Sequence, residues 1–209
     1  MKAASVTKNL QSATTVRSEP SPRRLRSVRL ALGVRYLLFT GVSVGAVGIA
    51  GRYLAWPLLT STIGPTAYVF AAHPRSEAAR FQNALFGHAV AIACGLGALI
   101  VFGLVRHPSV GETGSPSLSQ AAAAAAAVGM TVFLLETVGS HHAPSAATAL
   151  LITTGLAKPG APLIGLVLGL AIVIAIGPLI GRIPFPRGAS QVERSSDRQA
   201  PDRTGTLVS

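Results

Sequence analysis

The chain has 209 residues, of which 49% are hydrophobic and only 12% are charged, yet its net charge is +11. A soluble domain usually carries about a quarter charged residues, so this composition excludes an ordinary soluble enzyme. Residues 1–29 hold seven basic side chains and one acidic, residues 182–209 hold five basic and three acidic, and the long apolar block between them holds only six basic and three acidic. An apolar block with basic ends is typical of an integral membrane protein.

Residues 1–29 are rich in Ser, Thr and Pro, so we expect them to form a disordered tail. The cluster Ser21-Pro22-Arg23-Arg24-Leu25-Arg26 directly precedes the first apolar run, which favours a cytoplasmic position and contact with anionic lipid headgroups. No aromatic residue is interleaved for stacking, so we do not predict nucleic-acid binding. The pattern does not match a secretory signal, and we expect a retained first membrane helix. A second disordered tail is predicted at 182–209, with both tails on the cytoplasmic side of the plasma membrane.

Six apolar segments follow in chain order: 30–50, 53–72, 84–105, 118–138, 143–157 and 162–180. About 20 helical residues are needed to cross a hydrocarbon core of about 30 Å. The fifth segment is too short, and the second contains Gly64-Pro65, where a continuous helix is not expected. The sequence therefore predicts an all-α integral membrane protein with four transmembrane helices in 30–181 and two short interrupted, re-entrant segments. Six crossings are the alternative.

The two halves of the apolar block are similar to each other. Gly64-Pro65-Thr66-Ala67 matches Ala143-Pro144-Ser145-Ala146, which lies 79 positions later. Ala84-Leu85-Phe86-Gly87 matches Pro162-Leu163-Ile164-Gly165 at a nearly equal offset. Each half then consists of a long helix, an interrupted segment and a second long helix. An internal two-fold repeat and a chance match of small apolar residues both remain open.

The prolines predict where two short helices begin. Proline is favoured at the first position of a helix, so Pro65 and Pro144 each indicate a helix start within an apolar segment. A helix start carries unpaired N–H groups and a partial positive charge, which in a membrane must contact protein or a wet cavity. Two such starts facing each other would attract an anion. Two proline kinks packed by neighbouring helices are the alternative.

A few polar residues lie at membrane depth. Arg35 either extends to the cytoplasmic headgroups or points into the bundle to hold an anion. Glu136 can reach the interface, pair with Arg35, or carry protons. His88 is more often a satisfied buried histidine than a ligand, and the adjacent His141 and His142 diverge by about 100° on a helix, so no metal site is predicted. A proton relay through His88, Glu136 and one of the adjacent pair is the stronger alternative.

The run His142-Ala143-Pro144-Ser145-Ala146-Ala147-Thr148-Ala149-Leu150 resembles the signature of the HPP family, His-Pro-Pro followed by small residues and Thr-Ala-Leu. Ile63-Gly64-Pro65-Thr66-Ala67 and Asn83-x-x-x-Gly87-His88 resemble two further elements of the family. The chain departs from the family pattern with Ala143 in place of a proline and with Arg80-Phe81-Gln82 in place of Gln-Pro-Arg. The resemblance covers roughly residues 30–181. It implies a four-spanning membrane domain and, for some plant and cyanobacterial members, nitrite transport.

These observations favour a transporter or channel for a small anion such as nitrite, with no cofactor. The residues expected to line its path are Gly64, Pro65, Thr66, His142, Pro144, Ser145, His88 and Arg35. The alternative is a non-transporting membrane module, an assembly subunit or a sensor, whose basic tail contacts lipid or a partner. An enzyme is not expected, because the sequence holds no nucleophile set, phosphate loop or paired carboxylates. The glycine-rich helix faces allow close packing within one chain or in a homo-oligomer, and both remain open.

Overall fold

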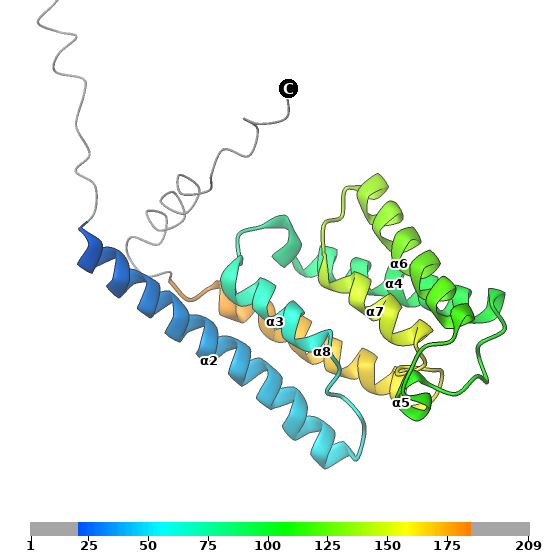
Figure 1. Ribbon diagram of the computed structural model, residues 1–209. Helices are drawn as coiled ribbons and strands as arrows, with labels where there is room; N and C mark the ends of the chain where they lie inside the picture. The colour runs from blue at the N-terminus through cyan, green and yellow to red at the C-terminus, as the bar shows by residue number, and fades with distance from the viewer. Residues whose placement is uncertain (1–20, 185–209) are drawn as a thin grey trace, which may run out of the picture. The chain divides into compact units, whose positions relative to one another are not determined.

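The computed structural model describes residues 21–184, so the tails predicted at either end lie largely outside the described residues. All regular structure in residues 21–184 is helical (Figure 1). Four helices are long and apolar enough to cross a membrane, which confirms the predicted all-α membrane architecture. The elements are α2 (Pro22–Leu54), α3 (Ile63–Ala72), η1 (Glu77–Ala79), α4 (Phe81–Val101), α5 (Val110–Thr113), α6 (Leu118–Val138), α7 (Pro144–Thr153) and α8 (Ala161–Gly181).

The first long helix begins earlier than predicted. α2 starts at Pro22, so residues 22–29, which the sequence assigned to a disordered tail, are helical. Proline is well accommodated in the first turn of a helix, and the arginines that follow it are good helix formers. At 1.5 Å per residue, the 33 residues of α2 extend about 50 Å, which exceeds a hydrocarbon core of about 30 Å. The arginine-rich first turns can therefore lie outside the hydrocarbon.

Helix α7 packs along α4 and runs in the same direction. A Cβ atom added at Gly87 would lie 2.9 Å from the Ser145 hydroxyl oxygen, and one added at Gly95 would lie 2.9 Å from the Ile152 Cβ atom. From the first contact to the second, the chain moves toward the C-terminal end of both α4 and α7, so the two helices are parallel. The missing side chains let the backbones approach closely, as small residues do in membrane helix pairs.

Helix α3 packs along α8 in the same way. Ile63 at the start of α3 contacts the position of Gly169, and Phe70 near its end contacts the position of Gly177. The irregular segment before α3 follows the same line, since the backbone of Pro57 lies against Gly165. The short helix of each half thus packs in parallel on the last long helix of the other half, an arrangement that fits the predicted internal repeat.

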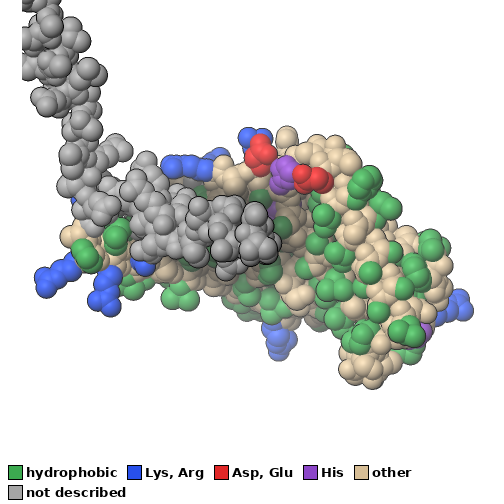
Figure 2. Space-filling model, turned by 45° about the horizontal axis from the view of Figure 1, so that its top comes forward, with side chains coloured by type: hydrophobic (Ala, Val, Ile, Leu, Met, Phe, Trp, Pro, Cys, Tyr) green, Lys and Arg blue, Asp and Glu red, His purple; other side chains and the backbone are tan. Residues whose placement is uncertain are grey.

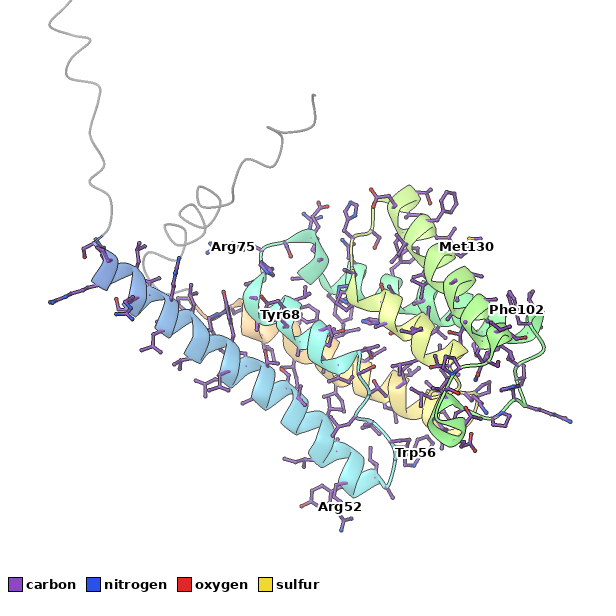
Figure 3. All side chains as sticks on the ribbon, viewed as in Figure 1. Arg52, Trp56, Tyr68, Arg75, Phe102 and Met130 are labelled. Atoms are coloured by element: carbon purple, nitrogen blue, oxygen red, sulfur yellow. The ribbon has the colours of Figure 1, made fainter. Side chains whose placement is uncertain are left out.

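The contacts at the two ends of the bundle define the path of the chain. At one end, named the proximal end here (residues 73–80, 139–143 and 182–184), His142 hydrogen bonds to the carbonyl of Ala78. At the other, the distal end (residues 52–57, 102–117 and 154–160), the amino group of Lys158 donates to the carbonyl of His107. Figure 3 shows Arg75 and Arg52 toward these opposite ends.

Each short segment follows a long helix, residues 139–158 along all of α4 and residues 57–72 along α8 from Gly165 to Gly177. Residues 139–158 start beside the start of α4 and finish against residues 107–110, which follow its end. Within the described residues the chain passes between the two ends six times, so the contacts fit the six-crossing alternative for the short segments.

A small capped turn closes the distal end. The side chain of Ser109 caps α5, and the Glu112 carboxylate accepts hydrogen bonds from the Ser109 backbone N–H at 2.6 Å and hydroxyl at 2.7 Å. The Ser109 hydroxyl and then its N–H lower the pKa of Glu112. The backbone N–H of Val110 donates to the carbonyl of Thr154 at 2.9 Å, which ties the turn to the end of α7.

The outward faces of the long helices are apolar. Exposed large side chains include Leu37 and Val42 on α2 and Met130 and Phe133 on α6. Figure 2 shows apolar side chains spread over the flank of the described part and charged ones gathered toward its edges. This distribution suits helices that face lipid, with charged groups near the headgroups.

Labelling of single cysteines in intact membranes tests the six-pass path. In a Cys94→Ala background, we expect Ser115→Cys and Ala161→Cys to react from one side of the membrane, because both lie at the distal end, and Arg75→Cys to react from the other. A membrane-impermeant maleimide, applied before and after permeabilisation, distinguishes the sides. Labelling of Ala161→Cys together with Arg75→Cys would instead show that the α7 segment turns back.

The close contact of α4 with α7 is tested by two alanine substitutions on one helix. We expect Gly95→Ala to lower the free energy of unfolding by about 1–3 kcal/mol, because the new methyl group overlaps Ile152. Gly97→Ala is the matched control, since nothing lies within 4 Å of its added Cβ atom. Alanine is favoured over glycine in a helix by up to about 1 kcal/mol, so this variant should be as stable or more stable. Unfolding in mixed micelles, followed by circular dichroism, measures both, and equal effects would contradict the packing.

Candidate functional site

A single buried imidazole joins the two short helices. His88 of α4 is 3% exposed, and its Nδ1 lies 2.8 Å from the Thr148 Oγ1 of α7. Its Nε2 lies 3.2 Å from the Thr66 Oγ1 of α3. Both threonines are fully buried. His88 therefore links α3 and α7 from opposite halves of the chain.

The hydrogen bonds assign the protons of this cluster. The Thr66 hydroxyl donates to the carbonyl of Thr62 at 2.8 Å, because a carbonyl oxygen can only accept. The Thr66 oxygen must then accept from the Nε2–H of His88, and the Nδ1 of His88 accepts from the Thr148 hydroxyl. Both ring nitrogens of a neutral His88 are thus satisfied, in agreement with the predicted satisfied histidine.

A second imidazole lies beside the first. The ring of His142 is 5.0 Å from the ring of His88 in an edge-to-face arrangement and 6.5 Å from the ring of Phe70. Its Nδ1 lies 2.7 Å from the carbonyl oxygen of Ala78, and the backbone carbonyl of His142 accepts a hydrogen bond from the Ser145 hydroxyl. The Nε2 atom of His142 is buried and has no hydrogen-bond partner.

Gly87 allows this close approach. A Cβ atom there would lie 2.9 Å from the Ser145 Oγ and 3.2 Å from the His142 Cβ. Because Gly87 has no side chain, the first turn of α7 lies directly on α4, next to His88. Pro144 occupies the first position of α7 and is buried there, as expected for a proline that starts a helix.

The structure brings together half of the residues predicted for the site. Thr66, His88, His142 and Ser145 form one buried cluster.

Gly64 and Pro65 lie at the start of α3, where Pro65 is exposed and Gly64 is half-buried. Their place in the fold is to begin the helix.

The two helix starts do not face each other as predicted. Residues 73–80 connect α3 to α4. Thr66 lies before this connection and His88 after it, and their side chains are in contact, so α3 runs antiparallel to α4. Since α7 is parallel to α4, the two short helices run antiparallel to each other, with His88 between them. In addition, the N–H groups of Ser145 and Ala146 donate to carbonyls within their own turn, at 3.1 and 3.2 Å. The site therefore centres on the histidines instead of on two open helix ends.

Arg35 and Glu136 lie at the proximal end with other partners. The Arg35 side chain is buried, its Nη1 donates to the carbonyl of Ile183 at 3.1 Å, and its guanidinium lies 4.8 Å from the Phe39 ring centre. Glu136 is exposed and lies 3.4 Å from His141. The pairing of Glu136 with Arg35 and its place in a relay with His88, both considered from the sequence, are not what these contacts show.

Two residues of the cluster were missed by the sequence analysis. Thr148 follows Pro144 by four positions, a spacing that puts both on one face of a helix, so it could have been found. Thr62 lies before α3 and contributes its carbonyl oxygen, which leaves no signal in the residue type. Among the described residues, no group of three or more His, Cys, Asp or Glu side chains could hold a metal ion.

A comparison with protein-family models identifies the chain. The model described as HPP, transmembrane region, matches residues 26–188. The chain belongs to the HPP family of membrane proteins. No curated protein and no solved structure shows significant similarity to it. The region matched by the HPP model includes the whole cluster around His88 and His142, so the cluster is part of the family's transmembrane region.

The threonine bond to His88 is tested by a double substitution. We expect Thr148→Val to lower the free energy of unfolding by about 1–3 kcal/mol, because it leaves the Nδ1 atom of His88 buried without a partner. His88→Leu combined with Thr148→Val should recover part of this loss, since both polar partners are then gone. Unfolding in mixed micelles measures the single and double variants. Strictly additive losses would show that the two side chains are not coupled.

Proposed function

We propose that this HPP protein carries a small monovalent anion, such as nitrite, across the cell membrane, and we assign it no catalytic step. The observation that carries the proposal is the buried polar cluster around the rings of His88 and His142 inside a largely apolar domain. Polar groups in a membrane interior are costly, and those that persist usually belong to a transport path or a relay. The unused Nε2 atom of His142 marks the place for the transported ion.

A cavity at the proximal end supports an entry route. It has a volume of about 520 Å³, and its lining includes Phe70, Arg80 and Gln82. Phe70 also contacts His142, so one phenyl ring lies between the cavity and the cluster. The Arg80 guanidinium at the cavity provides positive charge, although Glu77, 3.5 Å away, partly offsets it. Among the described residues of this lining, the Arg80 guanidinium is the one charged group, and a cation at the mouth of a cavity favours the entry of an anion over that of a cation.

Hydroxyl groups continue from the cluster along the segment before α3. The carbonyl of Thr62 binds the Thr66 hydroxyl, and the Thr62 and Thr60 hydroxyls lie 3.1 Å apart. Thr60 is half-buried and Thr62 fully buried. These groups supply polar contacts on the distal side of His88, where an ion that passed the histidines would next need them.

The charges support an orientation with the proximal end in the cytoplasm. That end carries Arg35, Arg75, Arg80 and Arg182, and further arginines precede Arg35 in the sequence of α2. The distal end carries Arg52, Arg106 and Lys158. The excess of basic residues lies on the cytoplasmic side of most membrane proteins. Both tails then lie in the cytoplasm, where the basic turns of α2 can contact anionic lipid headgroups.

Anion flux into liposomes tests the proposal. We expect purified protein to carry nitrite into liposomes well above the rate of protein-free liposomes. His142→Leu should reduce the initial rate of nitrite uptake at least about tenfold. This reduction corresponds to a loss of at least about 1.4 kcal/mol in the stabilisation of the anion on its path. Pro144→Leu should also reduce it, because it changes the start of α7 that holds His142.

His141→Leu is the matched control for this experiment. His141 is adjacent in sequence, but its side chain is about half exposed and lies against Glu136. We expect this variant to retain the wild-type rate. If correctly inserted wild-type protein moved no small anion, the transport proposal would be refuted. The alternative, a non-transporting membrane module, would then be favoured. Unchanged flux in His142→Leu would instead show that the site is elsewhere.

A further inference from the structure

His142 has a buried nitrogen with an unused lone pair. The residue is 1% exposed, and its Nδ1 must carry a proton, because the carbonyl oxygen of Ala78 at 2.7 Å can only accept. In the neutral imidazole the Nε2 atom is then a bare acceptor, and no hydrogen-bond donor contacts it. Buried polar atoms are nearly always paired, so this exception requires an explanation.

The groups packed around His142 carry no fixed charge. They include the Phe70 ring from α3, the neutral His88 ring and Gly87 from α4, the backbone of Ala78 from η1 and the Ser145 hydroxyl from α7.

The charged groups on neighbouring elements lie at the surface and pair with one another. Glu77 and Arg80 flank Ala78, with side chains that are 56% and 67% exposed. Glu136 and His141, on α6 and in the turn after it, are 74% and 51% exposed. None of these four is a buried cation placed to balance an anion beside His142.

Of the two neighbouring histidines, only His142 can accept a proton without losing a hydrogen bond. Both nitrogens of His88 already have partners, and a proton on its Nδ1 would require the Thr148 hydroxyl to turn away. A proton on the Nε2 of His142 would break no bond. It would add a donor directed away from Ala78 while the Nδ1–H bond stays in place.

An anion at this site and a proton on His142 stabilise each other. An isolated charge of either sign is strongly disfavoured in a low-dielectric interior. Together they form a neutral pair, joined by a charge-assisted hydrogen bond from Nε2–H to the anion. Because the free energy of coupling is reciprocal, each must raise the affinity for the other.

We propose that the Nε2 atom of His142 takes up a proton when a small anion binds beside it, so that the protein moves the anion and the proton together. This inference rests on the proposed anion transport. The proton comes from water on the side where the anion enters, forms an N–H bond at Nε2, and returns to water when the anion leaves. No other bond forms or breaks, and the pair crosses without net charge.

Proton uptake on binding tests this inference at equilibrium. In a weakly buffered detergent solution near neutral pH, we expect nitrite added to the wild-type protein to raise the pH, approaching one proton for each bound anion. His142→Gln, whose amide can donate to an anion but cannot be protonated, should bind nitrite with no proton uptake. His141→Leu should behave as the wild type. Nitrite binding to wild type without proton uptake would overturn the inference.

Flux in liposomes separates failure of this inference from failure of transport. We expect wild-type nitrite uptake to accelerate when the interior is made alkaline and to be indifferent to an imposed membrane potential. His142→Gln should lose the response to the pH gradient and become sensitive to the potential. If wild-type uptake depended on the membrane potential and not on the pH gradient, the coupling of anion to proton would be refuted. The transport proposal would still hold. Absence of any uptake would refute both, and the wild-type measurements decide the matter even if the variant does not fold.

Discussion

Two hydrogen bonds to the ring of His88 are the interaction on which the rest of the structure depends. Through them α4 holds Thr66 of α3 and Thr148 of α7, residues that belong to opposite halves of the chain. In an apolar interior each of these polar groups would be costly alone, and satisfied together they give the two short helices one specific place. The ring of His142 then packs on His88, so this bridge also positions the one imidazole nitrogen in the cluster that has no partner.

The bridge is possible because glycines bring the helices close together. Gly87 and Gly95 let α7 lie on α4, and Gly169 and Gly177 let α3 lie on α8. Each short helix thus packs in parallel on a long helix of the other half. Two halves that exchange their interrupted segments in this way cannot separate without breaking both contacts, so residues 33–184 form one compact unit around a polar centre.

The chemistry of that centre differs from a simple anion site built on helix starts. The first-turn N–H groups of α7 are used within their own turn, and the contacts of Arg35 lie at the proximal end. For the proposed anion transport, positive charge beside His88 must then come from a group that can gain it. A histidine with a vacant lone pair is such a group, since its charge can appear only when the anion is present to stabilise it.

Features of the protein that arise locally could be predicted from its sequence. Hydropathy and length specified an all-α membrane protein with four long helices, and Pro144 predicted the start of α7, because a helix start depends on neighbouring residues. The motif around His88 and His142 also indicated most of the polar cluster. The sequence did not predict that the short helices run antiparallel, that Thr148 completes the bridge, or that the Nε2 atom of His142 has no hydrogen-bond partner. These depend on contacts between residues about 60 positions apart, such as His88 with Thr148 and His142 with Ala78, and no local pattern encodes such pairings.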